Sequence, residues 1–254
     1  MESGGNGMLG QGALHADVTV PTLLFEFEDM PFKQIGCGAL HTAALTESGE
    51  VWACGTGEYG RLASGQALSG DQLNLEPVDG LDGKVIKSIS VGNAFTLALS
   101  EEGELYCWGR NDTGQLGQGG GLSMDVYCFE DLPVPVLDSM DGEIIVDMSA
   151  GHGHAAAVTN DGKLFMWGMK RYLEPEYMSV LEGKKVTGVA CGDKITAALT
   201  DEGEVYTFGP GKFGSLGHGN TSTEVQPKLV EALQGLKVVK IACGDKHVAA
   251  LVEF

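Results

Sequence analysis

A short segment recurs five times along the chain, and this repeat limits the possible folds more than any other feature. Each copy joins a glycine to a run of small and apolar residues such as Ala-Ala-Leu, and the glycines are Gly38, Gly92, Gly151, Gly192 and Gly244. The copies stand roughly 40 to 60 residues apart, a period typical of propeller blades and similar repeat units. We therefore expect a fold assembled from units that are each too small to bury a core alone.

The first four copies continue in the same way. An acidic turn with a glycine comes next, at residues 47–50, 101–104, 160–163 and 201–204, and a short aromatic segment ending in glycine follows at residues 51–55, 105–109, 164–168 and 205–209. The turn glycine can adopt positive φ and close a tight hairpin. Glycine-rich loops follow at residues 60–65, 114–119 and 214–219. With an apolar run before each copy and another after each loop, we predict four short strands per repeat, the content of a propeller blade.

The composition fits this interpretation and excludes several classes of function. The 39 glycines suit many tight turns, and 43% hydrophobic residues are enough for a packed core. A net charge of −19 without a basic patch argues against direct binding to nucleic acid. None of the six cysteines forms a C-x-x-C pair, so we expect no metal and no other cofactor. Without an apolar leader or a membrane-length apolar run, we expect an intracellular protein, cytoplasmic or nuclear, that does not bind membranes.

The combined pattern, C-G-x-x-H-T-x-A-L-T-x-x-G-E-V-W-x-x-G followed by G-x-L-G-x-G, resembles the repeat of the regulator-of-chromosome-condensation family. The resemblance covers nearly the whole chain and implies an all-β fold, a β-propeller of four-stranded blades that forms one domain over residues 1–254. The implied repeats span approximately residues 33–84, 85–143, 144–184 and 185–236, with a fifth made of residues 237–254 joined with 1–32. Members of the family usually have seven blades, and this chain is too short for seven.

The two ends of the chain suggest how a ring of blades could close. Residues 6–12 resemble the glycine-rich loop after a third strand, and residues 18–24 would then be a fourth strand, while residues 237–254 supply a first and a second strand. We therefore predict a five-bladed ring in which both termini share one blade, so that no sheet edge is exposed. The alternative is a piece of a larger propeller, because the shared blade has no sequence for its third strand.

The expected strand order divides the loops between two faces. The hairpins between second and third strands are acidic, as at Glu101, Glu102 and Glu104. These acids either suit exposed turns or attract a basic partner. On the opposite face, the third repeat lacks the glycine-rich loop and has residues 169–175 instead, a basic and aromatic segment in an acidic chain.

This mixed face is where we predict the partner-binding site. Arginine and tyrosine are among the residues that dominate binding hot spots, and loops on a rigid scaffold commonly carry binding residues. The residues expected to form the site are Lys170, Arg171, Tyr172, Asn111, Asp112 and Phe213. The alternative is that residues 169–175 are a degenerate part of the repeat and form a solvated loop.

Histidine recurs at one matching position of several repeats, and tryptophan recurs on the expected third strand. Recurrence favours a packing role, because catalytic groups rarely repeat around a ring. The residues to which we assign such a role are His41, His154, His247, Trp52, Trp108 and Trp167. Without a nucleophile triad, a phosphate-binding loop or a metal signature, we expect that the chain is not an enzyme.

The resemblance implies a protein–protein interaction scaffold that presents loops to a protein or peptide partner. The alternative is a guanine-nucleotide exchange factor for a Ran-like small GTPase, an activity known in the family. The residues that match its loop acids and histidines are His41, His154, Asp193, Asp245 and His247. The chain lacks the β-hairpin wedge and the basic N-terminal tail of such exchange factors. It also lacks the Gly-Trp-Arg-His-Thr motif of the similar plant ultraviolet-B photoreceptor, so we do not expect light sensing.

Overall fold

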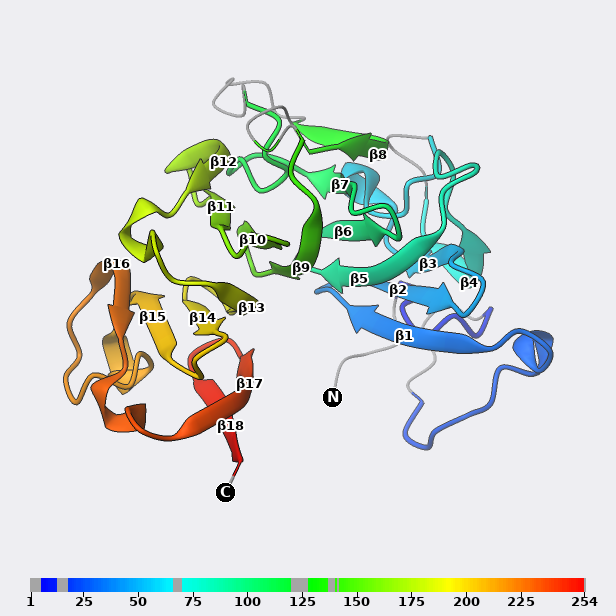
Figure 1. Cartoon of the computed structure of the whole chain (residues 1–254). Helices are drawn as coiled ribbons and strands as arrows, with labels where there is room; N and C mark the ends of the chain where they lie inside the picture. Colours follow the sequence, from blue (N-terminus) through cyan, green and yellow to red (C-terminus); the bar gives the residue numbers. More distant parts are fainter. Residues whose placement is uncertain are drawn as a thin grey trace. The chain divides into compact units, whose positions relative to one another are not determined.

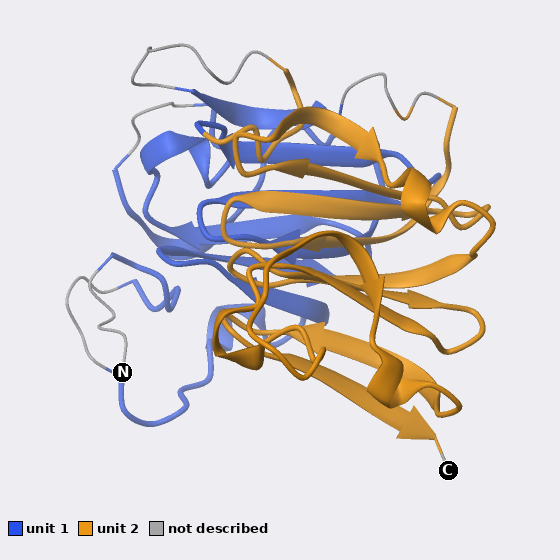
Figure 2. Ribbon diagram, turned by 90° about the vertical axis from the view of Figure 1, so that its left-hand side faces the viewer, with its two compact units in different colours: residues 1–112, 123–136 blue, residues 113–122, 137–254 orange. Residues whose placement is uncertain are grey.

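Short strands and single 3-10 turns make up the regular structure in the computed structural model, which describes residues 6–12, 18–65, 70–119, 128–136, 140 and 142–253 (Figure 1). The chain divides into two compact units, which Figure 2 shows in different colours. Unit 1 comprises residues 1–112 and 123–136, and unit 2 comprises residues 113–122 and 137–254. No helix in the described ranges is long and apolar enough to cross a membrane.

Unit 1 contains two four-stranded antiparallel sheets, each with its strands in chain order, and we call each such sheet a blade. Blade 1 consists of β1 (Phe32–Cys37), β2 (His41–Thr46), β3 (Val51–Gly55) and β4 (Gln72–Pro77). Blade 2 consists of β5 (Ile86–Val91), β6 (Phe95–Ser100), β7 (Leu105–Arg110) and β8 (Phe129–Pro135). The 3-10 turns of this unit are η1 (Phe25–Phe27) and η2 (Glu58–Gly60).

Unit 2 contains two blades of the same topology and a two-stranded sheet. Blade 3 consists of β9 (Ile145–Ala150), β10 (His154–Thr159), β11 (Leu164–Gly168) and β12 (Tyr172–Tyr177). Blade 4 consists of β13 (Val186–Cys191), β14 (Thr196–Thr200), β15 (Val205–Gly209) and β16 (Glu224–Leu229). The two-stranded sheet consists of β17 (Lys237–Cys243) and β18 (Val248–Glu253), and the 3-10 turns are η4 (Ser179–Leu181), η5 (Lys212–Gly214) and η6 (Glu231–Leu233). The all-β fold of four-stranded blades is therefore confirmed.

The second strand of each blade is its most buried element. All residues of β6 and β10 are buried, and in β10 three consecutive alanines let neighbouring sheets approach closely on both faces. In unit 1, Ala43 of β2 shares a core cluster with Ile89 and Ala98 of blade 2. In unit 2, Ala156 of β10 shares a cluster with Ala198 of blade 4. Each unit is thus held together by packing between consecutive blades.

Two tryptophans lock a blade to the loop that precedes it in the chain. The indole N–H of Trp108 donates to the Arg61 carbonyl at 3.1 Å, and that of Trp167 donates to the Gln115 carbonyl at 2.9 Å. Both side chains are 0% exposed, which confirms their packing role. Trp52 differs, because it is only partly buried and packs edge-on against Phe27.

The N-terminal segment has the conformation expected of a glycine-rich loop. Gly7, Gly10 and Gly12 have φ values of 76°, 65° and 71°, close to the 77°, 69° and 65° of the loop at residues 114–119. The Gly12 N–H donates to the Leu73 carbonyl of β4 at 2.9 Å. In the same way, the Gly119 N–H donates to the Leu173 carbonyl of β12 at 3.0 Å. Residues 6–12 therefore dock on the fourth strand of the next blade, as the later loops do.

The fourth strand expected at residues 18–24 is absent from the structure. These residues form no strand, because no described strand lies beside them to provide hydrogen-bond partners, and Val20 and Leu23 are 67% and 63% exposed. Leu24 leads into η1 with φ and ψ of −88° and 91°, much as Val230 leads into η6 with −81° and 90°. The segment thus ends as a fourth strand does. The repeat boundaries and the five-bladed ring remain predictions.

Candidate partner-binding loops

The loop between the third and fourth strands differs most from blade to blade. We call these segments the 3–4 loops; they cover residues 56–71, 111–128, 169–171 and 210–223. The sequence contains three arginines, and all of them lie in a 3–4 loop or at its border. They are Arg61, Arg110 and Arg171. Each guanidinium group lies over a tyrosine ring.

The 3–4 loop of blade 3 is a tight turn of unusual composition. Met169 and Lys170 have φ values of 56° and 57°, and the Arg171 N–H donates to the Gly168 carbonyl at 3.1 Å. Two consecutive left-handed residues define a type I′ hairpin turn, where Asn-Gly is the favoured sequence. The expected loop over residues 169–175 is therefore too long: β12 begins at Tyr172, because Tyr172 already pairs with Gly168.

Arg171 and Tyr172 are brought together, as we expected. The Arg171 guanidinium carbon lies 4.9 Å from the centre of the Tyr172 ring, and its Nη1 donates to the Val225 carbonyl of β16 at 3.2 Å. Lys170 is exposed beside them, and its backbone N–H donates to the Thr113 carbonyl at 2.8 Å. The turn thus presents two cations on a fixed backbone: Arg171, which is stacked on Tyr172, and the exposed Lys170.

Phe213 occupies the 3–4 loop of blade 4, in the same unit. It has a φ of 72° and is 68% exposed, and the Lys212 ammonium lies 5.1 Å from its ring centre. A hollow of about 440 Å³ lies beside it, lined by Phe213, Leu216, Val230, Leu233, Lys246 and Val248. An aromatic side chain held out of the core over a partly apolar hollow is suited to contacting a partner.

Asn111 and Asp112, the other residues expected at this site, lie in unit 1. Asn111 is 7% exposed, and its backbone N–H donates to the Cys128 carbonyl at 2.7 Å. Asp112 forms an ion pair with Arg110 at 2.6 Å. The structure therefore shows the six expected residues as two groups, one in each unit.

Sequence reasoning missed a third cluster, which is in unit 1. The guanidinium carbons of Arg61 and Arg110 lie 5.2 Å and 5.1 Å from the centre of the same ring, that of Tyr59. Tyr59 has a φ of 60°, another left-handed residue that is not glycine. The rarity of arginine in an acidic chain was the signal that could have identified this cluster.

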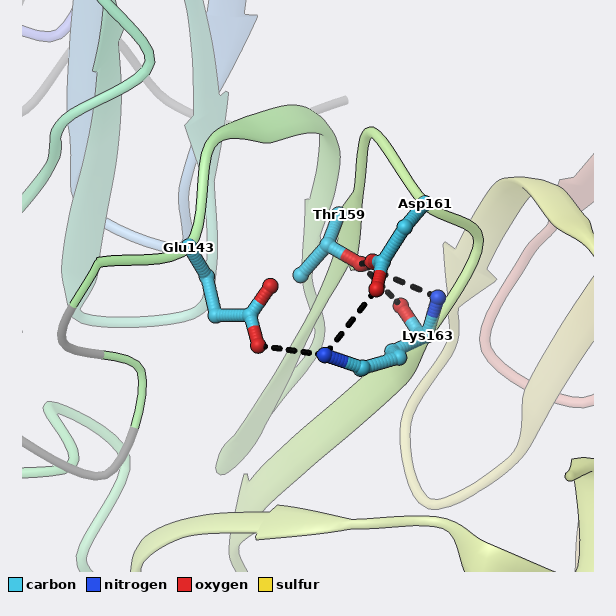
Figure 3. A network of polar contacts seen from close by, with 4 residues as sticks. All are labelled: Glu143, Thr159, Asp161 and Lys163. Carbon is cyan, nitrogen blue, oxygen red and sulfur yellow. Dashed lines mark hydrogen bonds and ion pairs between the residues drawn. The ribbon is translucent and has the colours of Figure 1, made fainter.

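The acidic hairpins are partly neutralised by lysines from the linkers between blades. Lys84 pairs with Glu104 at 2.6 Å, and Lys184 pairs with Glu204 at 2.8 Å. Hydrogen bonds from these lysines lower the pKa of both carboxyl groups. Blade 3 has the reverse arrangement, with the lysine on the hairpin and the acid on the linker. Figure 3 shows Lys163 between Glu143, at 2.6 Å, and Asp161, at 2.9 Å.

Two of the histidines suggested for nucleotide exchange are buried. His41 Nε2 lies 3.1 Å from the Thr96 hydroxyl, and His154 Nε2 lies 2.9 Å from the Thr196 hydroxyl. Burial lowers the pKa of His41 to about 3 and that of His154 to about 4, so both are neutral at physiological pH. Their packing role is confirmed, whereas the matching His247 is exposed.

The two acids suggested for exchange lie near each other in unit 2. The Asp193 N–H donates to the Asp245 carbonyl at 3.3 Å, and the Asp193 carboxylate lies 3.8 Å from the ring of His152. The Asp245 carboxylate is 3.1 Å from the Lys246 ammonium. No cluster of histidine, cysteine and acidic residues in the described parts of the chain could hold a metal ion.

Comparison with known proteins identifies the repeat. Two models of the regulator of chromosome condensation (RCC1) repeat match the chain, one at residues 3–45, 48–99, 102–158 and 202–251, and the other at residues 32–61, 86–115, 145–172 and 186–214. The sequence is 37% identical over 261 residues to the ultraviolet-B receptor UVR8 of Arabidopsis thaliana. That match covers 98% of this chain and 57% of the receptor.

Two solved structures have the same fold. Human WBSCR16 matches with a TM-score of 0.83 and 24% identity, over 98% of this chain and 66% of that one. Prp20p of Saccharomyces cerevisiae matches with a TM-score of 0.75 and 22% identity, over 92% of this chain and 57% of that one. The Prp20p structure is described together with its binding to Gsp1p and histones. The chain thus spans about two thirds or less of the length of these proteins.

Proposed function

Because the chain belongs to the RCC1 repeat family, we propose that it is a protein–protein interaction scaffold that binds a protein or peptide partner through its 3–4 loops. Repeat scaffolds of this kind hold loops rigidly while the loops vary, and the function is then carried by the loops and not by the fold. Related proteins range from an ultraviolet-B receptor to a protein that binds Gsp1p and histones. The role proposed here is binding, without catalysis by the chain itself.

The observation that carries this proposal is the turn at Met169 and Lys170. A left-handed conformation costs a residue with a side chain roughly 1–2 kcal/mol, and glycine would avoid that cost. Strained backbone of this kind is concentrated at functional sites. The turn also fixes Arg171 and Tyr172 in a stacked pair, which lowers the entropy lost when a partner binds. A net charge of −19 supports a protein partner over a nucleic acid.

The test compares two double variants of the chain in pull-downs from cell extract, with bound proteins identified by mass spectrometry. Arg171→Ala with Tyr172→Ala removes the stacked pair, and Glu101→Lys with Glu102→Lys reverses two exposed charges on a hairpin. We expect the first variant to bind its partner at least tenfold more weakly and the second to bind like wild type. Loss of the partner in the second variant alone would move the binding surface to the acidic hairpins.

Nucleotide exchange on a Ran-like GTPase is the second candidate. The exposed Asp245 and His247 in unit 2 favour it, as does the fold shared with Prp20p. The burial of His41 and His154 argues against it, because neither ring can reach a GTPase without unfolding of its strand. Binding through the 3–4 loops therefore has the stronger support.

A further inference from the structure

The cluster of Arg61, Tyr59 and Arg110 carries positive charge that the described part of the protein does not fully pair. Among the described residues, Arg110 forms one ion pair, with the Asp112 carboxylate at 2.6 Å, and its Nε atom is buried without a hydrogen bond. Arg61 is 5% exposed, and its Nε and Nη1 atoms are buried without a hydrogen-bond partner. It forms no ion pair within the described residues, and burial lowers its pKa, an effect that the nearby Glu58 opposes.

The backbone holds Arg61 in this place. Its carbonyl accepts the indole N–H of Trp108, and the preceding Gly60 lies so close to Glu130 and Asp131 of β8 that a Cβ atom there would clash with their backbone. Tyr59 and Arg61 are therefore fixed relative to β7, which ends at Arg110. Both guanidinium groups contact the Tyr59 ring, so the fixed backbone at Tyr59 and Arg61 holds the two arginine side chains next to each other.

Such an arrangement is costly unless something compensates for the charge. A buried cation without a partner is strongly destabilising, and folded proteins normally pair it or hydrogen-bond it. In the described part of the chain, Asp112 is paired with Arg110, and Glu58 lies near Arg61 without forming an ion pair with it. One negative group from a partner would compensate for the charge of the cluster. It could approach from the side of Arg110, whose side chain is 38% exposed.

We propose that Tyr59, Arg61 and Arg110 form a binding site for one carboxylate group of an acidic peptide segment. Arg110 contacts the carboxylate directly, Tyr59 holds Arg110 in position by stacking, and Arg61 adds the charge beneath them. Guanidinium groups match carboxylates in shape and hydrogen-bonding capacity. Two cations within a chain of net charge −19 suit one small anion and do not suit a polyanion such as nucleic acid. This inference rests on the proposed function, because it names the chemistry that a partner would bring to a 3–4 loop.

The small number of arginines makes a direct test possible. Protein labelled with ¹⁵N-arginine should give three side-chain Nε–H signals, which Arg→Lys variants assign. The probe is N-acetyl-glutamate α-amide, and its uncharged isostere N-acetyl-glutamine amide is the control. We expect the glutamate compound to shift the Arg61 and Arg110 signals in a saturable way, with Arg171 as the internal reference. The glutamine compound should leave all three signals in place.

Two variants separate binding from folding. Arg110→Gln removes the accessible cation at a partly exposed position and should weaken binding at least tenfold. Lys87→Gln, which removes an exposed cation of β5 in the same unit, should leave binding unchanged. Equal shifts of all three arginines, no shift at all, or inorganic phosphate binding more than tenfold tighter than the glutamate compound would each overturn the carboxylate site. The proposed function is tested at Arg171 and Tyr172, whereas this inference is tested at Arg110. Either one can therefore fail while the other holds.

Discussion

Replacing Trp108 by alanine tests the central packing feature of the fold. Trp108 is 0% exposed, contributes to the core between blades 1 and 2, and donates its indole N–H to the Arg61 carbonyl. The change removes apolar area from the core and leaves a loop carbonyl without its donor. Both effects destabilise unit 1 without touching a strand hydrogen bond.

The expected loss follows from the buried area. A tryptophan buries about 150–250 Å², which at about 25 cal/mol per Å² corresponds to about 4–6 kcal/mol. Because surrounding residues relax partly into the space, measured costs of large-to-alanine changes in cores are about 3–5 kcal/mol, and we expect a value in that range. Trp108→Phe keeps most of the ring and should cost less, with about 1 kcal/mol coming from the lost hydrogen bond.

Urea unfolding followed by far-ultraviolet circular dichroism measures these losses without relying on tryptophan fluorescence. Trp167→Ala is the matched change in unit 2 and should be as costly, because Trp167 is equally buried and donates to Gln115. Trp52→Ala is the control, and its partly exposed ring should cost roughly 1–2 kcal/mol. If Trp108→Ala unfolded within about 1 kcal/mol of wild type, or if Trp52→Ala cost as much, the inter-blade lock would be refuted.

Three further predictions concern histidines and exchange. Burial lowers the pKa of His41 to about 3 and of His154 to about 4, while the unfolded value is near 6.5. Their neutral forms therefore stabilise the fold above pH 6.5, and stability is lost as the pH falls below that value, by about 2 kcal/mol per histidine at pH 5. A His154→Gln variant should lose less stability than wild type between pH 7.5 and pH 5 in urea unfolding, and an equal loss would contradict the assignment. The chain should not accelerate release of labelled GDP from Ran, whereas acceleration that Asp245→Ala abolished would favour the exchange function. Finally, diethylpyrocarbonate should modify His247 much more slowly than a free histidine if a five-bladed ring closes over it, and fast modification would count against that ring.

The fold could be predicted because each constraint on it is local and repeated. A glycine in each acidic turn, such as Gly103 with its φ of 87°, fixes a hairpin, and a second strand with small residues, such as the three alanines of β10, requires close neighbours on both faces. These requirements recur in four blades, so a wrong prediction for one repeat can be recognised by comparison with the other repeats. The expected strand at residues 18–24 had no such support, because its conformation depends on a neighbouring strand and not on its own residues.

The candidate sites were harder to predict because they depend on contacts between residues from different repeats. Arg61 and Arg110 come from consecutive blades and meet at Tyr59 only because the loop before Arg61 is pressed against β8. The sequence pattern also placed Asn111 among exposed site residues, whereas the backbone buries it. Composition held the usable clue, since all three arginines of the sequence lie in a 3–4 loop or at its border, a distribution that packing alone does not require.

Comparison of the blades shows which positions the fold requires and which positions vary without affecting it. Trp108, Trp167 and Cys54 occupy the same position of the third strand, and each donates to a carbonyl of the loop before it, Cys54 through its thiol to Met8 at 3.6 Å. Blade 4 has Phe208 at this position, a buried ring without a donor, so the hydrogen bond belongs to three blades, whereas a buried side chain here is common to all four. Two of the 3–4 loops supply the accepting carbonyl, at Arg61 and Gln115, and the outer residues of the 3–4 loops vary and include left-handed Tyr59, Lys170 and Phe213. Because a glycine at those positions would stabilise the loop, the side chains retained there are where we expect binding to be encoded.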